Sequence, residues 1–360
     1  MSRVLFLVNH DVVIYNFRLE LVERLLADGH EVHISSPYGE RIDDLILLGC
    51  YYHQINISRH GINPAEELKL ILCYKKLLKD IKPDIVFTYT IKPNVYGGIA
   101  CSLANIHFVA NITGLGTAVE NGGAVQKITL LLYKIAFRKV QKVFFQNADN
   151  MQFFAKNKIA VGKQLLPGSG VNLNRFQILK YPSDQAVEFA FISRIMKEKG
   201  IDQYLEAAEY IRKKYPNTKF HICGFCEQNY EEILGKLVDK DVIVYHGMMR
   251  DIRTILEQVH CVIHPTYYPE GLSNVLLESL ACARPIITTN RSGCKEVIDE
   301  GINGLICEQR NSKDLIRQIE RFMALSWETR KQMGLAGRAK VEQQYDRQII
   351  VEKYIGELNH

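Results

Sequence analysis

Short apolar runs alternate with segments of helical periodicity along the chain. This alternation is typical of parallel β-sheets whose strands are joined by crossover helices. In the first half, the apolar runs predict strands at Val4–Val8, Glu31–Ser35, Asp84–Thr90, His107–Ile112 and Val143–Gln146. Between them, helical periodicity predicts helices at Phe17–Asp28, Pro64–Ile81 and Val95–Leu103.

The second half repeats this plan. Strands are predicted at Glu188–Ser193, Lys219–Cys223, Val242–Tyr245, Cys261–His264, Pro285–Thr289 and Gly304–Cys307. Helices are predicted at Gly200–Lys214, Asp251–Gln258, Ser273–Cys282, Ser312–Leu325 and Arg347–Leu358. We therefore expect an α/β protein with two Rossmann-like, doubly wound domains that face each other across a cleft. Residues 1–172 form the first domain and 173–345 the second, with the linker in Pro167–Pro182, and 346–360 form a helix that packs back on the first domain.

Composition narrows the class of protein. Hydrophobic residues make up 47% of the chain and charged residues 24%, which is typical of a folded protein. We expect a cytoplasmic protein, because no signal peptide or apolar run of ~20 residues is visible and the nine cysteines are scattered. The C-x-x-C pair Cys223 and Cys226 is interpreted as structural. Residues 1–180 hold 21 Lys and Arg against 14 Asp and Glu, whereas the second half is near neutral, which suggests that one domain meets an anionic partner.

Several common catalytic motifs are absent. The first strand is not followed by G-x-G-x-x-G, and the chain has no Walker A, H-E-x-x-H or G-x-S-x-G sequence. Dehydrogenases, P-loop kinases, zinc proteases and α/β-hydrolases are therefore disfavoured. Nucleic-acid binding is also disfavoured, because the chain has no cluster of basic residues with stacking aromatic residues among them.

The most informative stretch runs from His264 to Glu278. A predicted strand ends at His264, a loop carries Glu270 and Gly271, and a helix begins near Ser273. The N–H groups of Leu272, Ser273 and Asn274 are expected at the positive end of this helix, where they form an anion site. Glu278 lies roughly 6 Å further along the helix axis, within reach of the hydroxyl groups of a ligand bound there.

A second element, Ser193–Gly200, follows the first strand of the second domain. It supplies Arg194 and Lys199, a guanidinium with fixed donors and an ammonium point charge. Together they suit a diphosphate that gains charge as it leaves.

These two elements resemble those of the family 4 retaining glycosyltransferases of the GT-B fold. The resemblance implies that Arg194 and Lys199 bind the diphosphate and that Glu270, the carboxylate at the donor sugar, acts with them in catalysis. It also implies that Glu278 binds the ribose. The rest of the donor site would be Gly271, Leu272, Ser273, Asn274, Gly224, His246 and Met248, with the last two at the base.

The first half resembles a subgroup of these enzymes. Tyr15–Arg18, Lys92–Asn94 and Thr113–Gly116 are similar to segments of enzymes that extend lipid-diphosphate-linked glycans. The resemblance places Arg18, Thr113, Gly114 and Gly116 at the acceptor or in the cleft, although Arg18 has the alternative of pairing with Glu23 or Asp28 on its own helix. Many family members have a histidine after the fourth strand that contacts the donor sugar. This chain has Asn111–Thr113 at that place, so the histidine contact is not carried over.

Val125–Lys142 is open to two interpretations. Lys127, Lys134, Arg138 and Lys142 follow one helical stripe beside apolar residues. The stripe suits a core helix with a solvated basic edge, or an amphipathic helix that contacts an anionic membrane surface on the inner face of a bacterial cytoplasmic membrane.

The expected activity is transfer of a hexose or N-acetylhexosamine from a UDP-sugar to a polyprenyl-diphosphate-linked saccharide, with retention. No metal or cofactor is expected, because the basic side chains of Arg194 and Lys199 would take the place of a metal ion at the diphosphate. Two alternatives stay open: a nucleotide-sugar epimerase of similar fold, and a non-catalytic protein that binds lipid-linked glycans. Neither the transferred sugar nor the linkage is defined by these residues.

Overall fold

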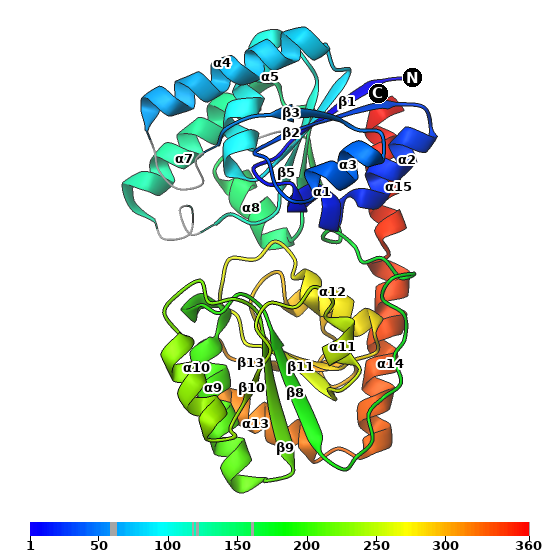
Figure 1. Ribbon diagram of the computed structural model, residues 1–360. Helices are drawn as coiled ribbons and strands as arrows, with labels where there is room; N and C mark the ends of the chain where they lie inside the picture. Colours follow the sequence, from blue (N-terminus) through cyan, green and yellow to red (C-terminus); the bar gives the residue numbers. More distant parts are fainter. Residues whose placement is uncertain (58–62, 117–118, 120–121, 160–161, 360) are drawn as a thin grey trace. The chain divides into compact units, whose positions relative to one another are not determined.

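The computed structural model describes residues 1–57, 63–116, 119, 122–159 and 162–359. These residues form two compact units. Unit 1 comprises Met1–Gly170, Glu270–Leu272 and Arg347–His360, and unit 2 comprises Val171–Pro269 and Ser273–Asp346. Each unit has its own parallel sheet with helices on both faces (Figure 1).

Unit 1 contains a 7-stranded sheet of order β3-β2-β1-β4-β5-β6-β7. Its strands are β1 (Arg3–Leu7), β2 (Glu31–Ser36), β3 (Tyr51–Gln54), β4 (Ile85–Tyr89), β5 (Phe108–Ile112), β6 (Lys142–Phe145) and β7 (Lys163–Leu165). The predictions of β1, β2, β4, β5 and β6 are confirmed. The two edge strands, β3 and β7, were not predicted, because they are short and are not apolar runs.

The helices of unit 1 cover both faces of this sheet. They are α1 (Val12–Phe17), α2 (Leu19–Ala27), α3 (Ile42–Leu47), α4 (Pro64–Ile81), the π-helix η1 (Pro93–Gly97), α5 (Gly98–Ala104), α7 (Gly123–Ala136), the 3₁₀ turn η2 (Phe137–Lys139), α8 (Ala148–Lys156), α15 (Arg347–Gly356) and the 3₁₀ turn η5 (Glu357–Asn359). The predicted α4 is confirmed, with Pro64 in its first turn and Asn63 capping its N-terminus. The helix predicted over Phe17–Asp28 is confirmed as α2, whereas α1 was not predicted; Arg18, with φ −139°, separates the two helices.

The last helix, α15, is part of the core of unit 1. It packs against α2, and its Tyr354 is fully buried with its ring 5.1 Å from that of Phe87. Arg347, at the start of α15, donates from Nη1 to Glu20 at 2.9 Å. Residues from the two ends of the chain therefore share one hydrophobic core.

A buried polar cluster joins α15 to the strand ends of unit 1. The Arg18 guanidinium lies 5.2 Å from the ring centroids of both Tyr89 and Tyr354, and its side chain is only 3% exposed. Tyr354 also donates to the side chain of Asn111. The suggested ion pair of Arg18 with Asp28 is not formed, because Asp28 accepts from Arg24 instead. Arg18 thus makes internal contacts beneath the carboxyl end of the sheet.

Unit 2 contains a 6-stranded sheet of order β10-β9-β8-β11-β12-β13. Its strands are β8 (Val187–Ile192), β9 (Thr218–Cys223), β10 (Val244–Tyr245), β11 (Cys261–His264), β12 (Ile286–Thr289) and β13 (Gly304–Cys307). All of them were predicted, although β10 is shorter than expected. Both sheets are doubly wound, as predicted: the strand order reverses beside β1 in unit 1 and beside β8 in unit 2.

The helical elements of unit 2 were predicted less completely. They are η3 (Lys197–Lys199), α9 (Ile201–Lys214), α10 (Glu231–Asp239), α11 (Arg253–Leu256), α12 (Asn274–Ala281), η4 (Lys295–Val297), α13 (Ser312–Met323) and α14 (Trp327–Gln344). Neither α10 nor α14 was predicted. The 18 residues of α14 are polar over most of their length and show no clear apolar stripe, which is the usual signal of an amphipathic helix.

Arg284 holds the linker to the core of unit 2. Its side chain is fully buried, and its guanidinium donates to the carbonyl oxygens of Leu256 at 2.6 Å and Lys180 at 2.7 Å. Further bonds reach the carbonyls of Leu179, Cys282 and Ala283. Burial lowers the pKa of Arg284 to about 10, which still leaves it charged at neutral pH.

Within the described part of the chain, no helix has the length and apolarity needed to cross a bilayer.

Candidate functional site

Three loops approach each other closely at the carboxyl ends of the unit 2 strands. Gly200 has φ +80°, and a Cβ there would lie 2.1 Å from the carbonyl oxygen of Pro265. Gly224 has φ +147°, and a Cβ there would lie 1.8 Å from the carbonyl oxygen of Ser193. Both positions therefore require glycine. They bring the loops after β8, β9 and β11 together.

Arg194 and Lys199 meet over one aromatic ring in this loop cluster. Arg194 Cζ lies 5.4 Å, and Lys199 Nζ 4.8 Å, from the ring centroid of Tyr268. The Lys199 side chain is only 8% exposed. The structure thus brings together the two cations that the sequence singled out, by means of a tyrosine to which the sequence analysis gave no role. The position of Tyr268, two residues before Glu270, was the sequence signal that could have identified it.

Arg194 also forms an ion pair with Glu227, in the loop after β9. Burial opposes the charged form of Arg194, but the hydrogen bond and charge of Glu227 outweigh it and raise the pKa of the guanidinium. Glu227 was also missed from sequence. The pair holds Arg194 charged and oriented at the strand ends.

The start of α12 differs from the prediction in one respect. Ser273 is the N-cap, and its side chain does not cap the helix. Its N–H donates to the carbonyl oxygen of Gly293 at 2.9 Å, so the expectation that this N–H serves a ligand is wrong. The buried side-chain oxygen of the next residue, Asn274, has no hydrogen-bond partner among the described residues.

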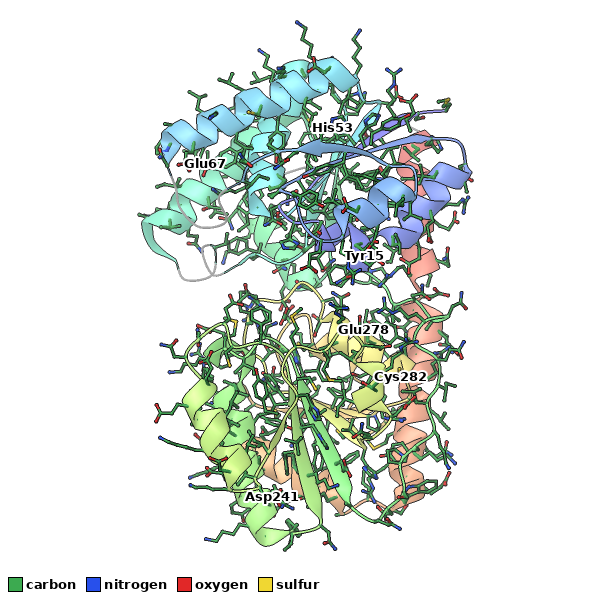
Figure 2. The ribbon with its side chains drawn as sticks, viewed as in Figure 1. Tyr15, His53, Glu67, Asp241, Glu278 and Cys282 are labelled. Atoms are coloured by element: carbon green, nitrogen blue, oxygen red, sulfur yellow. The ribbon has the colours of Figure 1, made fainter. Side chains whose placement is uncertain are left out.

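Glu278 lies half-buried one turn into α12 (Figure 2). It is in unit 2 with Arg194 and Lys199. The donor residues predicted for the second domain, apart from the loop Glu270–Leu272, therefore belong to one compact unit.

Glu270, Gly271 and Leu272 are grouped with unit 1. Asn147 Nδ2 donates to the carbonyl oxygens of Glu270 at 3.0 Å and Gly271 at 2.6 Å. A Cβ at Gly271 would lie 2.3 Å from the carbonyl oxygen of Thr113, so only glycine fits there. The loop that carries Glu270 is thus held through its backbone by the Asn147 side chain, a further residue that sequence reasoning missed.

The predicted site residues Gly114 and Gly116 lie in the same loop as Thr113. Their φ angles are +140° and +70°, which favour glycine. Only part of this loop falls within the described residues, which reach Gly116 and continue with residue 119 and then from residue 122.

His246 and Met248 follow β10. His246 Nε2 lies 3.0 Å from Nδ1 of His221, whose Nε2 lies 2.8 Å from Glu188. Burial opposes ionisation of Glu188, but His221 and Lys219 outweigh it and lower the pKa of the carboxyl, so that Glu188 orients the two rings as an acceptor. Met248 is 76% exposed. The His246 ring is therefore held in place by His221, whereas Met248 is exposed at the surface.

Both cysteines of the C-x-x-C pair are free thiols. Cys226 Sγ lies 4.0 Å from the hydroxyl of Tyr245. Among the described residues, no group of three His, Cys, Asp or Glu side chains is arranged to hold a metal ion.

The residues of 125–142 do not form one basic stripe. Lys142 lies in β6, where it pairs with Glu357, so its assignment to the helix is wrong. On α7, Ile128 is 50% and Leu131 58% exposed. Because these apolar side chains face solvent in the described structure, α7 is not simply a core helix with a basic edge.

Two family profiles match the chain. A profile of glycosyl transferases group 1 matches residues 175–340, and one described as glycosyl transferase 4-like matches residues 3–147. The two matches therefore fall within the two halves that the sequence pattern distinguishes.

Among curated proteins, the chain is similar to N,N'-diacetylbacillosaminyl-diphospho-undecaprenol α-1,3-N-acetylgalactosaminyltransferase of Campylobacter jejuni. The two are 27% identical, over 98% of this chain and 97% of the relative. The capsular polysaccharide biosynthesis glycosyltransferase CapM of Staphylococcus aureus is 26% identical, over 92% and 90%.

Solved glycosyltransferases share the fold. HepE of Anabaena, solved with UDP and glucose, superposes with a TM-score of 0.80 at 17% identity, over 99% of both chains. A glycosyltransferase of Rickettsia africae also reaches 0.80, at 19% identity, over 99% of this chain and 97% of its own.

Proposed function

We propose that this chain, which belongs to the glycosyltransferases of the GT-B fold, moves a hexose or N-acetylhexosamine from a UDP-sugar to a polyprenyl-diphosphate-linked saccharide. The transfer retains the anomeric configuration and needs no metal ion. It serves the assembly of a surface polysaccharide or related glycan.

The observation that carries the proposal is the position of Arg194 and Lys199 over Tyr268, at the strand ends of unit 2. The leaving diphosphate gains negative charge as the glycosidic bond breaks. Two fixed cations therefore stabilise the transition state more than the bound donor, which is what accelerates the chemical step. The donors at the start of α12 add to this effect.

The acceptor class is supported by the Campylobacter jejuni relative, whose name specifies a diphospho-undecaprenol-linked sugar as its acceptor. CapM supports a role in surface polysaccharide assembly. HepE, a neighbour in fold, was solved with UDP, which agrees with a UDP-sugar donor.

A screen of UDP-sugars against polyprenyl-diphosphate-linked saccharides, followed by mass spectrometry, tests the activity. We expect one donor and acceptor pair to give a product heavier by one hexose or N-acetylhexosamine. NMR of the new anomeric centre tests retention, and chelation of divalent cations is expected to leave the rate unchanged. Conversion of a UDP-sugar to its epimer without acceptor would instead indicate an epimerase. Binding of UDP without any turnover would indicate a non-catalytic protein.

Glu278→Gln is expected to raise the KM for the UDP-sugar about 10- to 100-fold, with a smaller change in kcat. The carboxylate is proposed to accept from ribose hydroxyls in both ground and transition states, and a hydrogen bond to a charged group contributes about 1.5–3 kcal/mol. Initial rates at varied donor concentration measure the change. Glu328→Gln, at an exposed position of α14, is the matched control. An unchanged donor KM would contradict the assignment.

We further propose that α7 contacts an anionic membrane surface. Its exposed side chains include Val125, Ile128 and Leu131, and it carries Lys127 and Lys134. Apolar side chains enter the headgroup region, and the lysines meet anionic lipid. Ile128→Ser combined with Leu131→Ser is expected to lower cosedimentation with phosphatidylglycerol vesicles several-fold. Transfer to a soluble acceptor should stay unchanged. Equal binding by the variant would refute the α7 contact.

A further inference from the structure

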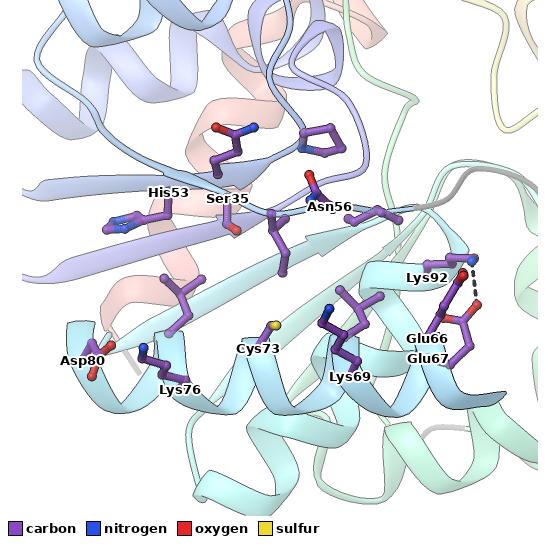
Figure 3. A pocket seen from close by; sticks show the side chains of 16 residues that line it. Ser35, His53, Asn56, Glu66, Glu67, Lys69, Cys73, Lys76, Asp80 and Lys92 are labelled. Carbon is purple, nitrogen blue, oxygen red and sulfur yellow. Dashed lines mark hydrogen bonds and ion pairs between the residues drawn. The ribbon is translucent and has the colours of Figure 1, made fainter. Parts of the chain in front are cut away.

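A cavity lies entirely within unit 1, between α4 and the sheet edge formed by β2 and β3 (Figure 3). Its volume is about 870 Å³, within the range of ligand-binding sites. None of the residues assigned to the donor lines it.

One wall of the cavity is a single face of α4. Glu66, Lys69, Cys73, Lys76 and Asp80 follow each other at intervals of three or four residues and point towards the sheet edge (Figure 3). From Glu66 to Asp80 this face extends about 21 Å, at 1.5 Å per residue. Such a length suits an extended ligand better than a compact one.

The charges on the lining are balanced. The lining has three lysines and three carboxylates, namely Lys69, Lys76 and Lys92 and Glu66, Glu67 and Asp80. Lys92 and Glu67 pair with each other at 2.6 Å (Figure 3). Burial, and then the neighbouring His33, lower the pKa of His53, which therefore adds no charge at neutral pH. A lining without net charge favours a neutral ligand over a polyanion or a polycation.

The sheet side of the cavity offers hydrogen bonds. The amides of Gln54 and Asn56 line it. The Ser35 side chain is fully buried, and its hydroxyl has no hydrogen-bond partner among the described residues. An unsatisfied buried hydroxyl is costly, and a ligand hydroxyl that reaches it removes this cost.

The lining also includes the apolar residues Ile55, Leu70 and Leu77. Mixed donors and acceptors beside apolar patches match a saccharide, which presents many neutral hydroxyls and apolar C–H surfaces. A lipid chain would leave the polar groups unsatisfied.

We propose that this cavity binds the saccharide portion of the acceptor, at sugars other than the one that receives the new residue. The inference rests on the proposed function, since that function makes a lipid-linked saccharide the acceptor. It adds a place on the protein where the acceptor is recognised by its length and hydroxyl pattern.

The chain carries a natural probe of this cavity. All nine cysteines are thiols that lie among the described residues, and Cys73, on the cavity wall, is the one that is exposed. Its alkylation by iodoacetamide can be followed by mass spectrometry in the wild-type protein, with the partly exposed Cys226 of unit 2 as internal reference. The ligand is the free saccharide released by mild acid from whichever lipid-linked acceptor supports transfer.

We expect the released saccharide, at concentrations above the acceptor KM, to slow alkylation of Cys73 at least ~5-fold and to leave Cys226 unaffected. Inorganic diphosphate and phosphatidylglycerol vesicles form the comparison arms, and should not protect Cys73. Protection by either of these without protection by the saccharide would overturn the proposal in favour of a phosphate or lipid site. An active enzyme whose Cys73 stays unprotected would also overturn it, while the proposed function would stand. If no acceptor supported transfer, the proposed function itself would fail.

Variants provide a kinetic test. Lys76→Ala and Asn56→Ala are each expected to raise the KM for the acceptor about tenfold, the effect of losing one good hydrogen bond, with kcat and the donor KM unchanged. Lys75→Ala is the matched control, because this adjacent lysine lines a different cavity with Leu78 and Lys79. An acceptor KM that changed equally in Lys75→Ala and Lys76→Ala would refute the assignment.

Discussion

Lys199→Ala is expected to lower kcat by about 10²–10³, the usual loss when one preorganised charge-stabilising donor is removed. The ammonium lies over Tyr268 with the side chain 8% exposed, so solvent screens it little. Its charge opposes the negative charge that develops on the leaving diphosphate. The loss should therefore appear in kcat and in kcat/KM, with a smaller effect on UDP affinity.

Lys197→Ala is the matched control for this experiment. Lys197 lies in the same 3₁₀ turn, but its side chain is exposed. Its removal changes the net charge of the turn equally and is expected to alter kcat less than twofold, because exposed charges are screened. Steady-state rates, with calorimetric titration of UDP, measure both variants. A Lys199→Ala enzyme with near-wild-type turnover would exclude the proposed role of Lys199.

Arg284→Met is expected to destabilise unit 2 by about 2–5 kcal/mol, since the carbonyl acceptors of the guanidinium lose their donors and each buried acceptor left unsatisfied costs about 1–3 kcal/mol. The methionine fills part of the volume but leaves the buried carbonyl of Leu256 and the partly buried carbonyl of Lys180 without their donors. Those carbonyls belong to the core and to the end of the linker. We therefore expect unit 2 to unfold at a clearly lower urea concentration.

The chain provides an intrinsic reporter for this measurement. Its single tryptophan, Trp327, lies in unit 2, with its ring 5.9 Å from that of Tyr181. Tryptophan fluorescence during urea unfolding therefore follows unit 2. Arg317→Met is the control: Arg317 is 73% exposed, so its removal should change stability by less than about 0.5 kcal/mol. Equal midpoints for the two variants would show that the buried hydrogen bonds of Arg284 contribute little.

The architecture was largely readable from the sequence because central parallel strands are buried on both faces and appear as apolar runs. The runs at Val4–Val8 and Cys261–His264 are clear examples. The edge strand Tyr51–Gln54 and the helix Trp327–Gln344 were missed for the opposite reason. Their residues are partly solvated, and their contacts, rather than a periodic pattern, decide their conformation.

For the site, the sequence singled out Arg194, Lys199, Glu270 and Glu278 as candidates, because their residue types and their spacing relative to strand ends, which resemble those of the family 4 glycosyltransferases, are local properties. Only the tertiary structure decided what surrounds them. Tyr268 and Glu227 became recognisable as partners of the two cations once the loops were folded together. In the structure, Arg18 is also buried between Tyr89 and Tyr354, which are distant in sequence. The Ser273 N–H donates to the carbonyl oxygen of Gly293. Local spacing determines which chemical groups a loop carries. Burial and hydrogen-bond partners depend instead on contacts between segments distant in sequence, and a single sequence does not reveal those contacts.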